Sequence, residues 1–185
     1  GYWNVTYGIT STIGGGQQNF INRDHATIGG GRNNQVYGDF GTIGGGGGLD
    51  EPGANIVYDT GGTIAGGTSN RVGTDDADPG DATYATVCGG DNNLARARGA
   101  AVSGGAWNRA DGVGASVGGG EANVALGDYA TVGGGGPIDF FQAVVGNYAT
   151  NDYATVAGGG QNEARGLYAT VPGGARNLAE GDHSF

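Results

Sequence analysis

Residues 100–114 read AAVSGGAWNRADGVG, and residues 115–129 read ASVGGGEANVALGDY. The two segments agree in the spacing of Val, a glycine-rich turn, Asn, Ala and a second Gly. The same pattern extends along the chain in ten units, seven of them 15 residues long and three lengthened by insertions. The units begin at Ser11, Ala26, Gly41, Gly62, Ala85, Ala100, Ala115, Ala130, Ala154 and Ala169. Written ATVGGGxxNxAxGxY and numbered from position 1 to 15, this unit is typical of a stacked repeat architecture.

Three positions of the unit form columns of similar residues. Position 3 is always a β-branched apolar residue, position 9 is always Asn, and position 11 is Ile, Val or Ala. Together with position 1, these residues follow the period-two alternation of short β-strands. The glycines at positions 4 to 6 and near position 13 are expected to provide the positive φ angles that tight corners need. Each unit is therefore predicted to run strand, turn, strand, turn.

The predicted fold is an all-β, parallel β-solenoid with about 15 residues in each coil, and it forms a single repeat domain over residues 1–185. Stacked coils lie about 4.8 Å apart, so ten of them measure on the order of 50 Å along the axis. Val and Ile are expected in buried columns. The stacked Asn residues are expected to form a structural ladder or a row of left-handed corners rather than a ligand site. The ladder residues are Asn19, Asn34, Asn70, Asn93, Asn108, Asn123, Asn162 and Asn177.

Composition and charge limit the classes of partner. With 45 glycines and few large apolar residues, the chain would be taken for disordered if its periodicity were ignored. The net charge of −10, from 18 acidic and 8 basic residues, opposes binding to nucleic acid. No apolar run reaches 18 residues, so no membrane insertion by this segment is expected. Cys88 is the sole cysteine, which excludes an intrachain disulfide framework.

The chain begins and ends in the middle of a coil. Asn4 corresponds to position 9 of an incomplete first unit, and Phe185 corresponds to position 2 of an incomplete last one. A coil interrupted in this way exposes unpaired strand edges. We therefore expect the chain to be part of a longer one, a processed piece, or a subunit whose ends are covered by neighbours.

Three insertions, at residues 47–54, 74–83 and 136–146, are expected to form loops at the corners and to carry the contact surface. The first contains Asp50 and Glu51, and the second reads TDDADPGDAT. The second loop is either a solvated acidic loop or a Ca²⁺ site, because carboxylate oxygens are the ligands that a hard cation prefers. The candidate metal ligands are Asp75, Asp76, Asp78 and Asp81. Apart from this Ca²⁺, no cofactor is expected.

The third insertion reads GPIDFFQAVVG, and such apolar content is unusual on a surface loop. It is expected to fold over an adjacent coil, to pack against another subunit or to contact a receptor. The candidate partner-binding residues are Ile138, Phe140, Phe141 and Val144.

Position 15 carries a column of ring side chains, which either covers the neighbouring coil or offers a face for stacking on sugars. Its members are His25, Phe40, Tyr84, Tyr129, Tyr153, Tyr168 and His183. The two histidines share this one repeat position, without a repeated acid or nucleophile beside them. The glycine runs recur without the Gly-Lys-Ser/Thr ending of a phosphate-binding loop. The chain is therefore not expected to be an enzyme, and no catalytic residue is assigned.

The segments GDYATVGGG, from Gly127, and GLYATVPGGARNLAEGDHSF, from Gly166, resemble the head repeats of trimeric autotransporter adhesins. They are also similar to repeats of bacterial surface proteins and phage tail-fibre-like proteins. The resemblance covers nearly the whole chain outside the insertions. It implies a left-handed parallel β-roll, three chains side by side, export and a role in attachment. A coil this small is also expected to leave part of its apolar columns uncovered, which would favour a homotrimer.

These observations predict an extracellular structural or adhesive fibre module at the cell surface, which is non-catalytic and uses its loops as the contact surface. Its partners would be further copies of itself and a surface glycan or protein receptor. One alternative is a self-assembling filament or surface-layer subunit joined head to tail. Another is an ice- or mineral-binding solenoid that uses the Thr column at position 2.

Overall fold

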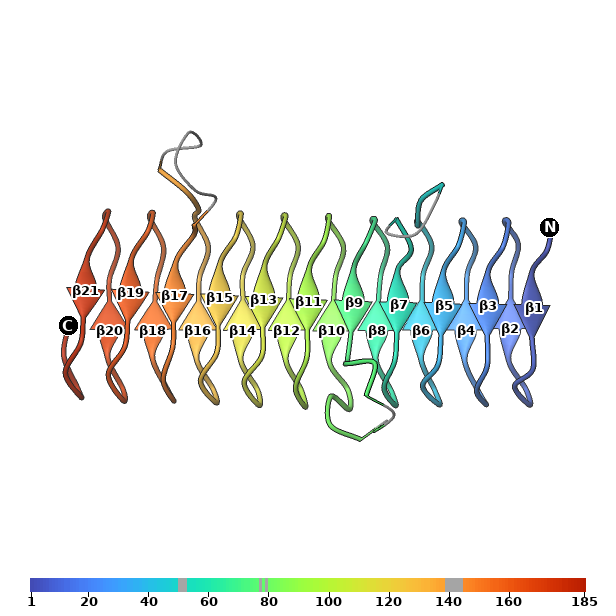
Figure 1. Cartoon of the computed structure of the whole chain (residues 1–185), viewed down its shortest axis with the longest axis horizontal. Helices are drawn as coiled ribbons and strands as arrows, with labels where there is room; N and C mark the ends of the chain where they lie inside the picture. Colours follow the sequence, from blue (N-terminus) through green and yellow to red (C-terminus); the bar gives the residue numbers. More distant parts are fainter. Residues whose placement is uncertain (50–52, 77, 79, 139–144) are drawn as a thin grey trace.

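The computed structural model describes residues 1–49, 53–76, 78, 80–138 and 145–185. Over these residues the chain is all-β, and its two-residue strands form one parallel sheet of eleven strands and another of ten. Strands of the two sheets alternate along the sequence, so each coil contributes one strand to each sheet. The coils follow one another in a long row with the two termini at opposite ends (Figure 1). This is the arrangement of a parallel β-solenoid, as predicted.

The strands of the first sheet, in their spatial order, are β1 (Val5–Thr6), β3 (Phe20–Ile21), β5 (Gln35–Val36), β7 (Ile56–Val57), β9 (Arg71–Val72), β11 (Leu94–Ala95), β13 (Arg109–Ala110), β15 (Val124–Ala125), β17 (Tyr148–Ala149), β19 (Glu163–Ala164) and β21 (Leu178–Ala179). Those of the second are β2 (Thr12–Ile13), β4 (Thr27–Ile28), β6 (Thr42–Ile43), β8 (Thr63–Ile64), β10 (Thr86–Val87), β12 (Ala101–Val102), β14 (Ser116–Val117), β16 (Thr131–Val132), β18 (Thr155–Val156) and β20 (Thr170–Val171).

The register of both sheets follows the repeat. Val102 pairs with Val87 on one side and with Val117 on the other, in phase with the 15-residue unit. The insertions do not disturb this register, because Val132 pairs with Val156 across the longest of them. Each insertion is therefore accommodated at a corner, and the columns continue past it.

The core lies between the two sheets and runs along the solenoid. Side chains at positions 1, 3 and 11 point inward, whereas the Thr, Ser and Ala residues at position 2 face outward and are partly exposed. The largest fully buried side chains are Ile21, Ile28, Ile43, Ile64, Val36, Val57, Val72, Val87, Val102, Val117, Val132 and Val156. Burial of one such side chain stabilises the fold by about 1.5–3 kcal/mol.

A single chain covers these Val and Ile columns away from its N-terminal end. The expectation that a 15-residue coil leaves part of them uncovered is therefore wrong. The reason is that position 1 holds only Ala, Gly or Ser, and Ala also fills position 11 from β11 onward, so the two sheets close on a narrow interior. The apolar surface that stays exposed comes largely from the ring side chains, such as Tyr84 and Tyr129.

The corners differ from the prediction in where their left-handed residues lie. Glycines at position 6, such as Gly105 (φ 84°), do adopt positive φ. Non-glycine residues at positions 8 and 15, such as Trp107 (φ 61°) and Tyr129 (φ 58°), do so as well. The glycine at position 13 has a different role, because a Cβ atom on Gly112 would strike the backbone carbonyl of Gly127 in the next coil. Where position 13 is Gly, as at Gly112, the close approach of the next coil and not the φ angle excludes a side chain, whereas other coils carry residues such as Ala97 or Asn151 there.

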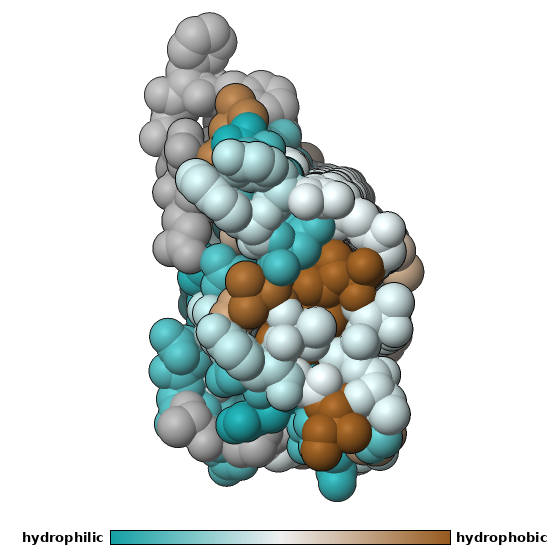
Figure 2. Space-filling view, turned by 90° about the vertical axis from the view of Figure 1, so that its right-hand side faces the viewer, coloured by the Kyte–Doolittle hydropathy of each residue, from teal (hydrophilic) through white to brown (hydrophobic). Residues whose placement is uncertain are grey.

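The N-terminal end of the solenoid is open. Val5 and Ile9 are 38% and 69% exposed there, and apolar side chains gather at the centre of this end (Figure 2). The described part of the chain contains no helix with the length and apolar character needed to cross a membrane.

Candidate functional site

The insertions project from two opposite edges of the solenoid (Figure 1). Insertion 47–54, between β6 and β7, and insertion 136–146, between β16 and β17, lie on one edge. Insertion 74–83, between β9 and β10, lies on the opposite edge. The two insertions that share an edge both follow the glycine-rich turn, so this geometry comes directly from their place in the repeat.

The first residues of insertion 136–146 lie against the next coil of the solenoid. Gly136 bridges to Gly160 in the next coil, and the Ile138 side chain lies where a Cβ atom on Gly160 would be. Ile138 is still 46% exposed. Ile138 thus lies against the adjacent coil, which is one of the three expected roles of this loop, and the partner-binding role of Ile138 stays a prediction. Phe140, Phe141 and Val144 lie outside the described residues, and their role stays a prediction.

Insertion 47–54 is held at its base by hydrogen bonds on both sides. The Asn33 side-chain amide donates to the carbonyl of Gly48 (2.9 Å), and the Ser69 backbone amide donates to that of Gly53 (3.2 Å). Between them, Leu49 is 70% exposed. Asp50 and Glu51 lie outside the described residues. The edge that carries insertions 47–54 and 136–146 therefore exposes one apolar side chain at each of them, Leu49 and Ile138.

Insertion 74–83 does not gather its four aspartates at one point. Asp76 and Asp78 accept backbone amides two residues ahead of them, from Asp78 and Gly80, both at 3.0 Å, so Asp78 belongs to a local turn. The Thr74 hydroxyl lies 2.8 Å from Asp76 Oδ2 and 3.0 Å from Asp81 Oδ2. The structure thus brings Asp76 and Asp81 together, and Asp75 is exposed. Across the described ranges, no three His, Cys, Asp or Glu side chains stand in an arrangement that could hold a metal ion as they are.

A further carboxylate, absent from the sequence-based set, faces this loop from the solenoid body. Asp59 follows β7, is 1% exposed, and its Oδ2 accepts no hydrogen bond from the described residues. The Asp81 carboxylate lies at hydrogen-bonding distance from it. Burial, followed by the nearby Asp81, raises the pKa of Asp59 from 3.8 to about 7, against the opposing effect of the Thr74 amide. Asp59 occupies position 13, where other coils carry Gly, Ala, Asn or Arg, and its being the one acidic residue in this column is the signal that could have identified it.

Asp76 has the opposite electrostatic environment. The backbone amide of Asp78, followed by the Thr74 hydroxyl, lowers the pKa of its carboxyl group. Asp76 is therefore ionised under conditions in which Asp59 still holds a proton, and the two acids of one corner differ in charge state.

The column of rings at position 15 covers neighbouring coils. Tyr129, Tyr153, Tyr168 and His183 stack in order, with ring centroids 5.3, 4.7 and 5.1 Å apart and planes within 12° of parallel. Desolvation, followed by the neighbouring Tyr168 and Tyr129, raises the pKa of Tyr153. The faces of the inner rings are occupied by one another, which favours the covering role over stacking on sugars. His25 stacks on Phe40 in the same way, at 4.8 Å.

The Asn column is a hydrogen-bonded ladder. Asn108 Oδ1 accepts the backbone amide of Asn123 (3.0 Å), and its Nδ2 donates to the carbonyls of Gly104 and Gly120 (2.9 Å each). One side chain thereby joins two successive coils and closes its own glycine turn. The prediction of a structural ladder is confirmed, and the non-glycine residue of this corner with a positive φ is Trp107, directly before Asn108.

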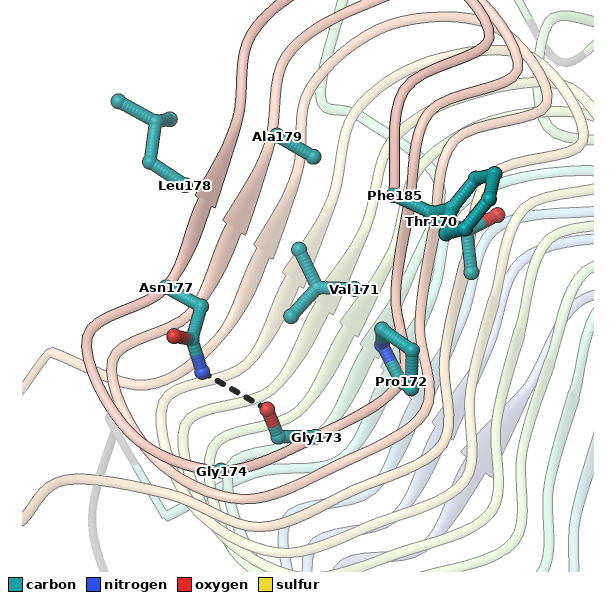
Figure 3. A pocket seen from close by; sticks show the side chains of 9 residues that line it. All are labelled: Thr170, Val171, Pro172, Gly173, Gly174, Asn177, Leu178, Ala179 and Phe185. Atoms are coloured by element: carbon teal, nitrogen blue, oxygen red, sulfur yellow. Dashed lines mark hydrogen bonds between the residues drawn. The ribbon is translucent and has the colours of Figure 1, made fainter.

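The C-terminal end of the core is open as a pocket. Figure 3 shows Val171 and Ala179 on facing strands, with Phe185 beside Thr170 and the Asn177 amide donating to the carbonyl of Gly173 (2.8 Å). The lining residues are Thr170, Val171, Pro172, Gly173, Gly174, Asn177, Leu178, Ala179 and Phe185. All belong to the last coil or to the residues that follow it. The pocket is thus the uncovered end of the solenoid interior.

No protein-family model matches this chain, and a search of the curated proteins finds no relative.

Proposed function

We propose that this chain is an extracellular, non-catalytic fibre module of the cell-surface or tail-fibre type. Its regular solenoid acts as a spacer, and its edge insertions form the contact surface. The observation that carries this proposal is the placement of insertions 47–54 and 136–146 on the same edge of an otherwise regular body, with Leu49 and Ile138 exposed there. A partner that spans both loops would be a surface glycan or a protein receptor.

The proposed assembly is a homotrimer of left-handed β-rolls packed side by side. It is supported by the resemblance to the head repeats of trimeric adhesins and by ring side chains that remain exposed, such as Tyr84 at 70%. The net charge of −10 disfavours unspecific association of the copies, so contact is restricted to surfaces that match.

Absolute mass from light scattering tests the assembly, and attachment of labelled protein to cells or glycan arrays tests the function. Replacing Leu49 and Ile138 together by Ser is expected to abolish attachment and to leave the thermal transition unchanged. Leu178→Ser is the matched control, because Leu178 is 52% exposed but lies on a sheet face of the last coil. Attachment that survives the double replacement would contradict the proposed contact edge, and a monomeric mass would contradict the trimer.

A filament joined head to tail is the second candidate. It is favoured by the apolar side chains that are exposed at both ends, Val5 and Ile9 at one end and Leu178 and Phe185 around the pocket at the other. A further coil, from the same chain or from a second copy, would pair with the exposed strand edges. Lengthening of the purified protein into fibres, seen by electron microscopy, would support this candidate over a discrete trimer.

A further inference from the structure

Two departures from the repeat meet at one corner of the solenoid. Position 13 carries Asp59 at the end of β7, and the following coil carries insertion 74–83 at the equivalent corner. The buried acid and the acidic loop therefore lie one coil apart, directly beside each other.

The Asp59 carboxylate is buried on the inner side of this corner. It is 1% exposed, and its Oδ2 receives no hydrogen bond from the described residues. It lies over Gly73, where any Cβ atom would collide with Oδ2. A buried carboxylate oxygen without a donor is costly, so its environment requires a proton or a cation.

The loop adds more carboxylate oxygens than donors, because among the described residues the backbone amide and the hydroxyl of Thr74 are the donors that face Asp59 and Asp81. The Asp81 carboxylate contacts that of Asp59, and the Thr74 hydroxyl lies between Asp81 and Asp76. A hydroxyl has one proton, so at any moment it can donate to one of these two carboxylates only.

No basic side chain compensates this group of acids. The ion pairs among the described residues join Arg96 and Arg109 to Asp111, and Arg165 to Glu163 and Glu180, so none reaches this corner. The carboxylates of Asp59, Asp81 and Asp76 therefore have no positively charged side chain of the protein paired with them.

We propose that Asp59, Asp81 and Asp76 bind a Ca²⁺ ion that fastens insertion 74–83 to the solenoid body. Asp59 is the fixed ligand, since it is buried in the coil, and Asp81 already faces it. Asp76 lies on the exposed loop and completes the protein ligands by turning its side chain across Thr74. Water and loop carbonyls supply the remaining oxygens of the six to eight that Ca²⁺ takes. Ca²⁺ suits this corner better than Mg²⁺, which demands near-ideal octahedral geometry.

This inference goes beyond the proposed function, because the site lies on the edge opposite the contact insertions and needs neither a partner nor a trimer. It also revises the expected ligand set: Asp59 enters it, and Asp75 and Asp78 leave it.

Titration calorimetry of the chelator-treated protein with CaCl₂, and separately with MgCl₂, tests the site. We expect one Ca²⁺ per chain, with a dissociation constant on the order of 10⁻⁴ M, as in extracellular calcium modules. Asp59→Asn keeps the shape of the buried side chain and is expected to weaken binding at least tenfold. Asp75→Asn, in the same loop but outside the contacts, is the matched control and is expected to bind like the original chain.

Hydrogen exchange of the peptide that contains Asp76 and Asp81 provides a second readout. Ca²⁺ is expected to slow exchange there in the original chain and in Asp75→Asn, but not in Asp59→Asn. If Asp59→Asn does not fold, as judged by circular dichroism, Asp81→Asn on the exposed loop replaces it in both experiments. Absence of binding, or binding that Asp59→Asn and Asp81→Asn leave unchanged, overturns the proposal. The latter result would mean that cations gather on the acidic surface without a site.

Discussion

Replacing Asn108 by Ala tests the Asn ladder at the middle of the solenoid. The replacement removes three hydrogen bonds, those with Gly104, Gly120 and Asn123. At about 1 kcal/mol for each net hydrogen bond, the expected loss is about 3 kcal/mol. The Gly120 carbonyl keeps the Ala106 amide as a donor, whereas the Asn123 amide loses its acceptor in a buried position. Most of the cost should therefore come from Asn123.

Urea unfolding followed by circular dichroism measures this loss. With a slope of about 2 kcal/mol per molar urea, the midpoint should fall by about 1.5 M. Asn22→Ala is the matched control, because the same side chain is removed at an exposed position, and its effect should stay within about 0.5 kcal/mol. A midpoint for Asn108→Ala no lower than that of the control would refute the ladder as a source of stability.

Asn108→Asp tests the donating amide group of Asn108 separately from its accepting oxygen. It keeps an oxygen for the Asn123 amide but turns a second oxygen toward the carbonyls of Gly104 and Gly120, which now accept from Nδ2. At pH 7 this variant should be less stable than Asn108→Ala, since the introduced charge is buried beside two carbonyl dipoles. Its stability should recover below about pH 4, where the introduced carboxyl is protonated in both states.

Three further predictions address the core, the corners and the acidic pair. Val102→Ala should destabilise the chain by about 2 kcal/mol, because it removes two methyl groups from a buried column, and the urea midpoint would show it. Gly114→Ala and Gly99→Ala both place a side chain at positive φ (64° and 67°), but the added methyl at Gly114 also meets a Tyr ring of the next coil, so its melting temperature should fall further. In chelator, the raised pKa of Asp59 means that the folded state binds the extra proton, so stability should fall as pH rises from about 4 to about 7 and then level off. Asp59→Asn should remove that slope, and thermal unfolding across this pH range would measure it.

The repeating part of the fold was predictable because the same residue pattern occurs ten times along the chain. Any one Val or Asn is ambiguous, but the position 3 and position 9 columns recur in every unit and leave one arrangement in which they stack. The left-handed Tyr129 was not predictable in this way. Backbone preference favours Gly there by roughly 1–2 kcal/mol. Ring stacking with Tyr153 stabilises Tyr by about 0.5–1.5 kcal/mol, and it is visible once the coils are in place.

At the acidic corner, the repeat pattern alone did not predict which residues come together. Asp76 and Asp81 were found because acids cluster in one insertion, whereas Asp59 is a single acidic residue at a repeat position outside any insertion. Its importance depends on a loop that enters from the following coil, and that relation follows from the stacking, not from the local sequence. Ile138 is similar, since its contact with Gly160 joins an insertion to the next coil.

The direction of the backbone hydrogen bonds has a mechanical consequence. Bonds such as those from Thr131 to Ala154 and from Gly133 to Val156 run between coils, parallel to the long axis. Tension applied to one end of the chain therefore loads the bonds of the terminal coil first, and the coils are peeled off one after another. Each released coil of 15 residues adds about 50 Å of extended chain. A single solenoid under tension would yield in equal steps, and the longer coils with insertions would give longer steps at fixed places in the series.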